Sequence, residues 1–187
     1  MFIDFDNDGD QDLYVSNYYL QRDELWQNNG NGTFTNMIVN KGLDINAAGT
    51  RSGHGTGVDW ADYDNDGDMD LLLPQLAHPN YMISFDHRST TIYRNGGSPA
   101  YQFTNLIGQQ MNNPGLTAQG IEYEETQAGG MWGDINNDGL LDLFFTAYYG
   151  CRYAKLYLQK SDHTFELKSY EFGLQIFVAG SDAAVFV

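Results

Sequence analysis

Several features that would assign this chain of 187 residues to other protein classes are missing from it. The single cysteine, Cys151, excludes an intrachain disulfide framework, and we expect it to be a small buried hydrophobic residue. Only 9 residues are basic against 25 acidic ones, and the resulting net charge of −16 argues against nucleic acid as a partner. No apolar run approaches the ~18–20 residues of a membrane span, so no span is expected in this segment.

Helical patterning and a targeting signal are absent as well. No window repeats apolar residues at helical spacing over a useful length. The opening residues, MFIDFDND, show neither a basic region nor an apolar stretch, so no signal peptide is expected in this segment. The hydrophobic fraction of 42% and the aromatic fraction of 14% indicate a folded, β-rich protein and not a disordered acidic tail.

The acidic residues that the chain does contain gather in three loops of one pattern. These loops are DFDNDGDQD at Asp4–Asp12, DYDNDGDMD at Asp62–Asp70 and DINNDGLLD at Asp134–Asp142. Calcium prefers six to eight oxygen ligands, and oxygens on alternate residues of a tightly coiled loop converge on one point when a glycine allows the turn. The pattern therefore predicts up to three bound calcium ions, one in each loop.

Two other interpretations of the loops are weaker. An EF-hand needs a glutamate at loop position 12 and flanking helices, whereas Val15, Leu73 and Phe145 stand there between predicted strands. A solvated acidic turn without metal would leave up to five carboxylates repelling one another within nine residues. We expect the calcium to stabilise the fold and not to catalyse, because the motif supplies no acid–base partner.

More than the loop is repeated along the chain. Each loop lies between two short strands, a hairpin follows with a phenylalanine on its last strand, and a Gly-Leu pair ends the unit (Gly42-Leu43, Gly115-Leu116 and Gly173-Leu174). The predicted strands are 1–4, 12–17, 24–29 and 33–38; 57–62, 70–75, 91–95 and 101–107; and 129–134, 142–149, 155–160 and 164–170.

Repeated four-stranded antiparallel units are typical of a β-propeller. The predicted fold is accordingly all-β: a partial propeller with blades at about 1–45, 57–116 and 129–174, followed by the first strand of a fourth blade at about 181–187. Since propellers close with four to eight blades, we expect further blades of a longer parent chain.

These residues resemble FG-GAP/VCBS-type repeats, which form the calcium-binding propeller of integrin α subunits and of many secreted bacterial proteins; the group that includes cartilage acidic protein is the most similar in pattern. The resemblance covers essentially the whole chain and implies side-chain ligands at loop positions 1, 3, 5 and 9 and a backbone carbonyl at position 7. The implied side-chain ligands are Asp4, Asp6, Asp8 and Asp12; Asp62, Asp64, Asp66 and Asp70; and Asp134, Asn136, Asp138 and Asp142. The implied carbonyl ligands belong to Asp10, Asp68 and Leu140.

The third loop departs from the pattern. It has Asn136 in place of an aspartate and Leu140 in place of an acid, so its side-chain ligands carry one negative charge fewer than those of the other loops. Because calcium affinity follows ligand charge, the third loop is predicted to bind most weakly.

The ligand-binding surface is expected at the edge opposite to the calcium loops, where the longer connections of an up-and-down meander lie. Tyrosines are frequent there and are typical of protein interfaces and sugar platforms. The candidates are Tyr18, Tyr19, Tyr81, Tyr148, Tyr149 and Tyr153. Polar residues of the same connections (His78, His87, Arg88, Arg152, Glu122, Glu124 and Glu125) could do acid–base work, but nothing in the sequence brings them together.

Two functions remain open from the sequence. The favoured one is a non-enzymatic, calcium-stabilised module, secreted or at the cell surface, that binds protein or glycan; free calcium outside cells suits sites of modest affinity. The alternative is the propeller portion of a secreted carbohydrate-active enzyme, such as a polysaccharide lyase or a hydrolase. Loss of turnover on substituting loop carboxylates, with folding intact, would distinguish the enzyme.

Overall fold

The chain forms β-strands and no helix in the residues that the structure describes. The computed structural model describes residues 1–18, 21–43, 54–75, 90–107, 119–121, 127–147 and 153–174. The strands are β1 (Phe2–Ile3), β2 (Asp12–Val15), β3 (Glu24–Asn28), β4 (Phe34–Asn36), β5 (Asp59–Ala61), β6 (Asp70–Leu73), β7 (Thr91–Asn95), β8 (Phe103–Asn105), β9 (Gln127–Gly133), β10 (Asp142–Ala147), β11 (Lys155–Gln159) and β12 (Phe165–Leu167).

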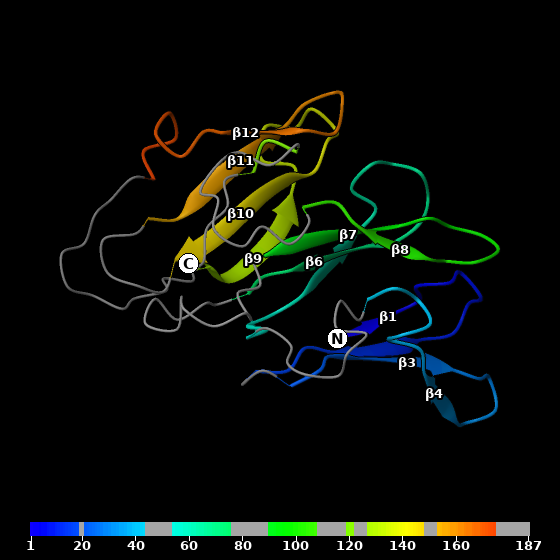
Figure 1. Ribbon diagram of the computed structural model, residues 1–187. Helices are drawn as coiled ribbons and strands as arrows, with labels where there is room; N and C mark the ends of the chain where they lie inside the picture. Colours follow the sequence, from blue (N-terminus) through cyan, green and yellow to red (C-terminus); the bar gives the residue numbers. More distant parts are fainter. Residues whose placement is uncertain are drawn as a thin grey trace.

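The strands build three antiparallel sheets of four, and in each sheet neighbours in space are neighbours in sequence (Figure 1). The first sheet is β1–β4, the second is β5–β8 and the third is β9–β12. The all-β prediction and the division into three four-stranded units are confirmed. The strand predicted at 181–187 lies outside the described residues.

Some strands end earlier than the apolar pattern predicts, because an asparagine side chain turns the chain. The side-chain oxygen of Asn36 accepts the N–H of Ile38 at 3.1 Å, and that of Asn105 accepts the N–H of Ile107 at 3.0 Å. Such local bonds compete with the sheet ladder. The strands predicted at 33–38 and 101–107 therefore stop at these asparagines.

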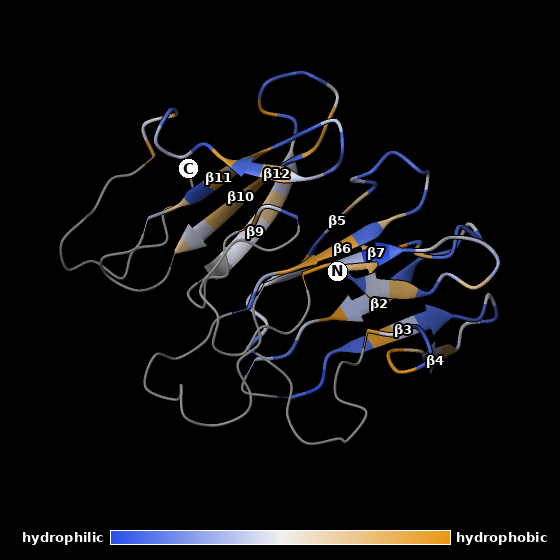
Figure 2. Ribbon diagram, turned by 45° about the horizontal axis from the view of Figure 1, so that its top comes forward, coloured by the Kyte–Doolittle hydropathy of each residue, from blue (hydrophilic) through white to orange (hydrophobic). Residues whose placement is uncertain are grey.

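The second sheet lies between the other two and is covered on both faces (Figure 1). Leu71 and Leu73 of β6 pack with the first sheet, whereas Leu72 packs with the third. Successive side chains of a strand point to opposite faces, so a strand that lies between two sheets needs apolar residues on both sides. The three leucines of β6 meet this need, and its first residue, Asp70, belongs to the acidic loop. All residues of β6 are accordingly buried, and Figure 2 shows this strand as largely hydrophobic.

One cross-strand row of large apolar residues recurs in each sheet. The rows are Phe2, Leu13 and Trp26; Trp60, Leu71 and Tyr93; and Trp132, Leu143 and Tyr157. The second row packs on the first sheet, with the rings of Trp60 and Tyr14 5.7 Å apart, and the third packs on the second sheet. The first row has no such cover from the described residues, and Phe2 is 65% exposed.

The chain closes each junction with a glycine and an apolar residue that follows it. Lys41 O accepts the N–H of Phe103 at 2.9 Å, and Gln119 O accepts that of Phe165 at 2.7 Å. Gly42-Leu43 and Gly120-Ile121 thus hold equivalent places, and Leu43 and Ile121 are both buried. The predicted pair Gly115-Leu116 lies outside the described residues.

Candidate metal centres

Each acidic loop is coiled around the carboxylate of its first aspartate. The two oxygens of Asp4 accept the N–H groups of Asp8 and Gly9, both at 3.1 Å. Asp62 accepts those of Asp66 and Gly67 at 2.9 Å, and Asp134 accepts those of Asp138 and Gly139 at 3.1 and 2.9 Å. The same two bonds in all three loops show that position 1 is a structural residue as well as a predicted ligand.

Two residues of each loop adopt the left-handed conformation that such tight coiling requires. The position-6 glycines have φ of +91°, +93° and +85° (Gly9, Gly67 and Gly139), and the position-4 asparagines have φ of 54°, 57° and 60° (Asn7, Asn65 and Asn137). Asparagine tolerates this region better than other non-glycine residues. The asparagine that recurs at position 4 is thus a signal that the sequence prediction left unused.

The last aspartate of each loop ties the loop to the third strand of its sheet. Asp12 accepts the N–H groups of Phe5 and Asn28 at 3.2 and 2.7 Å. Asp70 accepts those of Tyr63 and Asn95 at 3.1 and 2.7 Å, and Asp142 accepts those of Ile135 and Gln159 at 3.0 and 2.9 Å. All three carboxylates are almost completely buried.

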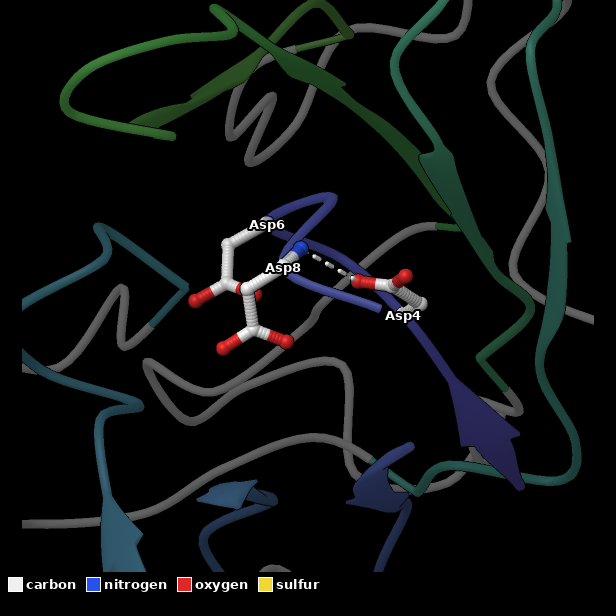
Figure 3. A group of neighbouring side chains, drawn as sticks. All are labelled: Asp4, Asp6 and Asp8. Carbon is white, nitrogen blue, oxygen red and sulfur yellow. Dashed lines mark hydrogen bonds between the residues drawn. The ribbon is translucent and has the colours of Figure 1, made fainter. Parts of the chain in front are cut away.

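The first two loops bring carboxylates together closely enough to share an ion. Oxygens of Asp4, Asp6 and Asp8 lie within 4.8 Å of one another, as do oxygens of Asp62, Asp64 and Asp70. Figure 3 shows the first group converging from a single loop, with the bond from the Asp8 N–H to Asp4 drawn. Among the described residues, these two are the groups of at least three His, Cys, Asp or Glu side chains that meet this distance.

A buried carboxylate oxygen at position 3 fits a metal ligand. Asp6 Oδ1 and Asp64 Oδ1 are both inaccessible to solvent and make no hydrogen bond with the described residues. An unpaired anionic oxygen away from water is costly. Two loops that repeat this arrangement at the same position therefore match the donor set that a hard cation prefers.

Burial raises the affinity of these carboxyl groups for protons. Burial raises the pKa of Asp12 to about 6 and that of Asp70 to about 7, against the pull of the two backbone N–H groups on each. Burial, and then the charge of Asp8, also raises the pKa of Asp6. Protons therefore compete with any cation for these sites in mildly acidic solution.

The third loop keeps the backbone of the other two but has fewer charges. Asn136 donates from its side-chain nitrogen to Asp138 Oδ2 at 2.9 Å, and its oxygen accepts the N–H of Asp138 at 2.9 Å. The amide of Asn136 thus forms two hydrogen bonds with Asp138, one to its carboxylate and one to its backbone N–H. Asp134, Asn136, Asp138, Leu140 and Asp142 occupy the predicted positions, and Leu140 offers only its backbone carbonyl.

A residue of the third strand contacts each of the first two loops, and sequence reasoning missed both residues. In the first sheet Gln27 Nε2 donates to Asp6 Oδ2 at 2.5 Å. In the second sheet Arg94 takes this place and forms ion pairs with Asp64 and Asp66 at 2.6 and 2.9 Å. In the third sheet Leu158 has the equivalent register. The segments ELWQN, TIYRN and KLYLQ carry these residues at their fourth position.

Side-chain amides link neighbouring loops. Asn95 Nδ2 donates to Phe5 O of the first loop at 2.9 Å, and Gln159 Nε2 donates to Tyr63 O of the second loop at 3.0 Å. Both residues also bind the last aspartate of their own loop through their backbone N–H. Asn7 adds a bond of 2.8 Å to Asp68 Oδ1. The three loops therefore form one connected edge across the sheets.

Two of the six candidate tyrosines can be placed. Tyr18 is 47% exposed, and its ring lies 4.7 Å from that of His54. Tyr153 is half-buried, with Lys155 Nζ 6.0 Å from the centre of its ring. The others, Tyr19, Tyr81, Tyr148 and Tyr149, lie outside the described residues, as do Cys151 and the polar candidates of the same connections.

Some of the connections at the edge opposite to the acidic loops contact one another. Asn17 O accepts the N–H of Gly55 at 3.1 Å, and Gly55 pairs with Gln75 in an isolated bridge. The connection after β2, the approach to β5 and the end of β6 are therefore side by side. At the opposite edge, Gly97 approaches Asp68 so closely that a Cβ would lie 2.3 Å from Asp68 Oδ2. The acidic loop and the glycine-rich turn of the second sheet thus share one edge.

Comparison with known families identifies the repeat in the first part of the chain. Residues 4–73 match the family model of the FG-GAP-like repeat. This stretch contains the first two acidic loops, so the predicted FG-GAP/VCBS-type repeat is confirmed. The third loop lies beyond the match but has the same backbone bonds. No curated protein matches the chain significantly.

Proposed function

We propose that this FG-GAP-like repeat chain is a non-catalytic, calcium-stabilised β-propeller module that binds a protein or glycan outside the cell. The observation that carries the calcium assignment is the repeated position-3 carboxylate, whose buried oxygen has no hydrogen-bond partner among the described residues in either of the first two loops. FG-GAP repeats are typically extracellular, and there calcium is abundant enough to fill sites of modest affinity. No helix in the described residues is long and apolar enough to cross a membrane.

The ligands proposed for each ion are the residues at positions 1, 3, 5 and 9 of its loop, with the carbonyl at position 7. Both oxygens of Asp4 and of Asp62 already accept backbone N–H groups of their loop. These two aspartates therefore fix the backbone of the loop and also supply negative charge to the ion. Bound calcium would supply the positive charge that gathers the remaining carboxylates. The other tasks fall to the protein itself: hydrogen bonds to position 1 coil the loop, packing keeps water from the position-3 oxygen, and backbone N–H groups hold the position-9 carboxylate.

The role proposed for calcium is structural. Asp12, Asp70 and Asp142 each join a loop to the third strand of the same sheet. An ion that binds only when these elements are together stabilises the folded state by mass action. Side-chain amides from the next sheet then bind the same loops, so the stabilisation extends across the sheet junctions.

Repetition of the apolar rows supports the propeller. Each of two sheets presents an aromatic–leucine–aromatic row to the sheet before it, and the first sheet presents the matching row of Phe2, Leu13 and Trp26 without cover from the described residues. A further sheet of the same kind would bury that row as the first sheet buries Trp60, Leu71 and Tyr93. Remaining blades of a longer chain are therefore the proposed partner of this face.

Ligand binding is proposed at the edge away from the acidic loops. Tyr18 presents a half-exposed ring there, beside His54, in a connection that contacts the second sheet. Aromatic rings at such an edge suit contacts with protein or with sugar faces. The edge with the acidic loops is proposed to bind calcium only.

The experiment is a calcium titration followed by thermal unfolding with and without EDTA. We expect binding of two to three ions, and a melting temperature that rises with calcium and returns to the metal-free value on chelation. The matched control carries Asp6→Asn and Asp64→Asn, which keep the volume of both side chains. This variant should lose most of the calcium-dependent rise. A melting temperature that is the same with calcium and with EDTA would show that the proposal is wrong.

A further inference from the structure

We infer that Arg94 is a built-in counter-cation of the second loop, which holds that loop together without metal and lowers its affinity for calcium. This inference rests on the proposed calcium binding and assigns one residue that tunes it. The sequence pattern of the loops contains no hint of such a residue, because Arg94 lies 24 positions after Asp70 in the chain.

The guanidinium group of Arg94 binds two of the proposed ligand residues at once. Its Nε lies 2.6 Å from Asp64 Oδ2, and its Nη2 lies 2.9 Å from Asp66 Oδ2. The Asp64 side chain is only 8% exposed, whereas that of Arg94 is 46% exposed. A planar guanidinium group fixes the positions of two carboxylates in a way that a single ammonium group does not.

The pairing coincides with a difference between the loops. In the first loop the converging carboxylates belong to positions 1, 3 and 5, whereas in the second they belong to positions 1, 3 and 9. Asp66, the position-5 residue of the second loop, is the one that Arg94 holds at 2.9 Å. We therefore attribute the altered grouping to the arginine, which draws Asp66 away from the other carboxylates.

The other two sheets show what stands in this place when no cation is supplied. Gln27 donates one neutral hydrogen bond to Asp6, the counterpart of Asp64. Leu158 has the same register in the third sheet and carries neither charge nor donor. In the first loop Gln27 thus adds no charge at the position-3 carboxylate, which the charge of Lys41 influences, whereas in the second loop Arg94 pairs directly with two of the proposed ligands.

Two consequences follow from this charge. A cation already seated on Asp64 and Asp66 relieves carboxylate repulsion, so the second loop needs less help from metal to stay folded. The same cation repels an incoming calcium ion and withholds one oxygen of each aspartate. By ligand charge alone the first two loops would be equal; with Arg94 included, the first loop is expected to bind calcium more tightly than the second.

The test compares Arg94→Gln with the reciprocal variant Gln27→Arg, because each gives one loop the facing residue of the other. Calcium is titrated into the isotope-labelled chain, and the amide signals of Gly9, Gly67 and Gly139 report the three loops separately by NMR. The free energy of unfolding of the same variants is measured in EDTA. Arg94→Lys serves as the control that keeps the charge but not the two-point contact.

In Arg94→Gln we expect the calcium affinity reported by Gly67 to rise about tenfold while that reported by Gly9 is unchanged. In Gln27→Arg the affinity reported by Gly9 should fall by a similar factor. In EDTA, Arg94→Gln should unfold more easily than the wild type, and added calcium should reverse the order. Arg94→Lys should leave the affinity at Gly67 below that of Arg94→Gln.

An affinity at Gly67 that stays equal or falls in Arg94→Gln, while Gly9 still titrates, would overturn this inference and leave the proposed function intact. The absence of any calcium response at all three glycines would overturn both. If Arg94→Gln does not fold, Gln27→Arg decides alone: an unchanged affinity at Gly9 would contradict the role given to a cation at this position.

Discussion

The first and third acidic loops have the same backbone and a different chemistry. In both, the first aspartate accepts the N–H groups of positions 5 and 6, and the last aspartate accepts one N–H from position 2 and one from the third strand. Yet the first loop holds five carboxylates and the third only three. The coil thus depends on positions 1, 6 and 9, and the charges at positions 3 and 7 are not needed to form it.

This difference separates what shapes the loop from what binds the ion. Asp6 has a buried oxygen without a hydrogen-bond partner among the described residues, whereas the amide of Asn136 donates to the carboxylate of Asp138 and accepts its backbone N–H. Extra carboxylates repel one another unless a cation is present. Repulsion among the carboxylates therefore destabilises the metal-free first loop more than the third, and the third loop depends less on a bound cation.

Replacing the last aspartate should have the largest effect and should sharpen the comparison most. Asp142→Ala leaves two buried N–H groups without an acceptor, so we expect a loss of about 3 kcal/mol in EDTA. Asp12→Ala removes the same two bonds but also relieves repulsion among the other carboxylates of the first loop, so its loss in EDTA should be smaller. In calcium the order should reverse. Chemical denaturation of both variants with and without calcium measures this, and the same order under both conditions would contradict it.

Exchanging the position-3 residue should alter calcium affinity to an intermediate degree. Asn136→Asp adds one negative charge to the third loop, and we expect its affinity to rise about tenfold. Asp6→Asn removes the charge from the first loop, whose affinity should fall by a similar factor. Calorimetric titration, with the NMR signals of Gly9 and Gly139 to separate the loops, provides the measurement. A third loop that already binds most tightly in the wild type would refute the assignment by charge.

The effect of pH should be the smallest and tests the cost of the buried carboxylates. In the metal-free chain the folded pKa is about 6 for Asp12 and about 7 for Asp70, both above the ordinary value of 3.8 for an aspartate. Since the folded state binds protons more tightly than the unfolded one, stability in EDTA should fall as pH rises from about 4 to about 7.

Calcium should change this pH dependence, because the ion replaces the protons. In excess calcium the fall in stability with rising pH should disappear, and calcium affinity should weaken as pH is lowered through about 7 towards 6. Denaturation curves in EDTA and in calcium across this range give the result. Asp70→Asn, which cannot titrate, should reduce the slope in EDTA; an unchanged slope would assign the pH dependence to other groups.

Much of the fold followed from local patterns in the sequence. Alternating apolar residues located the strands, and the turns between them placed the acidic loops at strand junctions. The neighbours of the loops did not follow. Arg94 and Asn95 lie more than 20 residues after the second loop, and Asn95 bonds to Phe5, which is 90 residues away in the chain. No local pattern shows that such residues meet.

By itself the sequence determined the coil of each loop, since a carboxylate, a left-handed asparagine and a glycine act within nine residues of one another. It also determined the count of three sheets, because the period of the pattern is a property of the chain alone. Tertiary structure decided which side chains contact the first two loops from other strands: glutamine and arginine. Those contacts depend on how sheets pack and pair, and electrostatic effects act through space, so the cation that distinguishes the second loop became visible only in the folded protein.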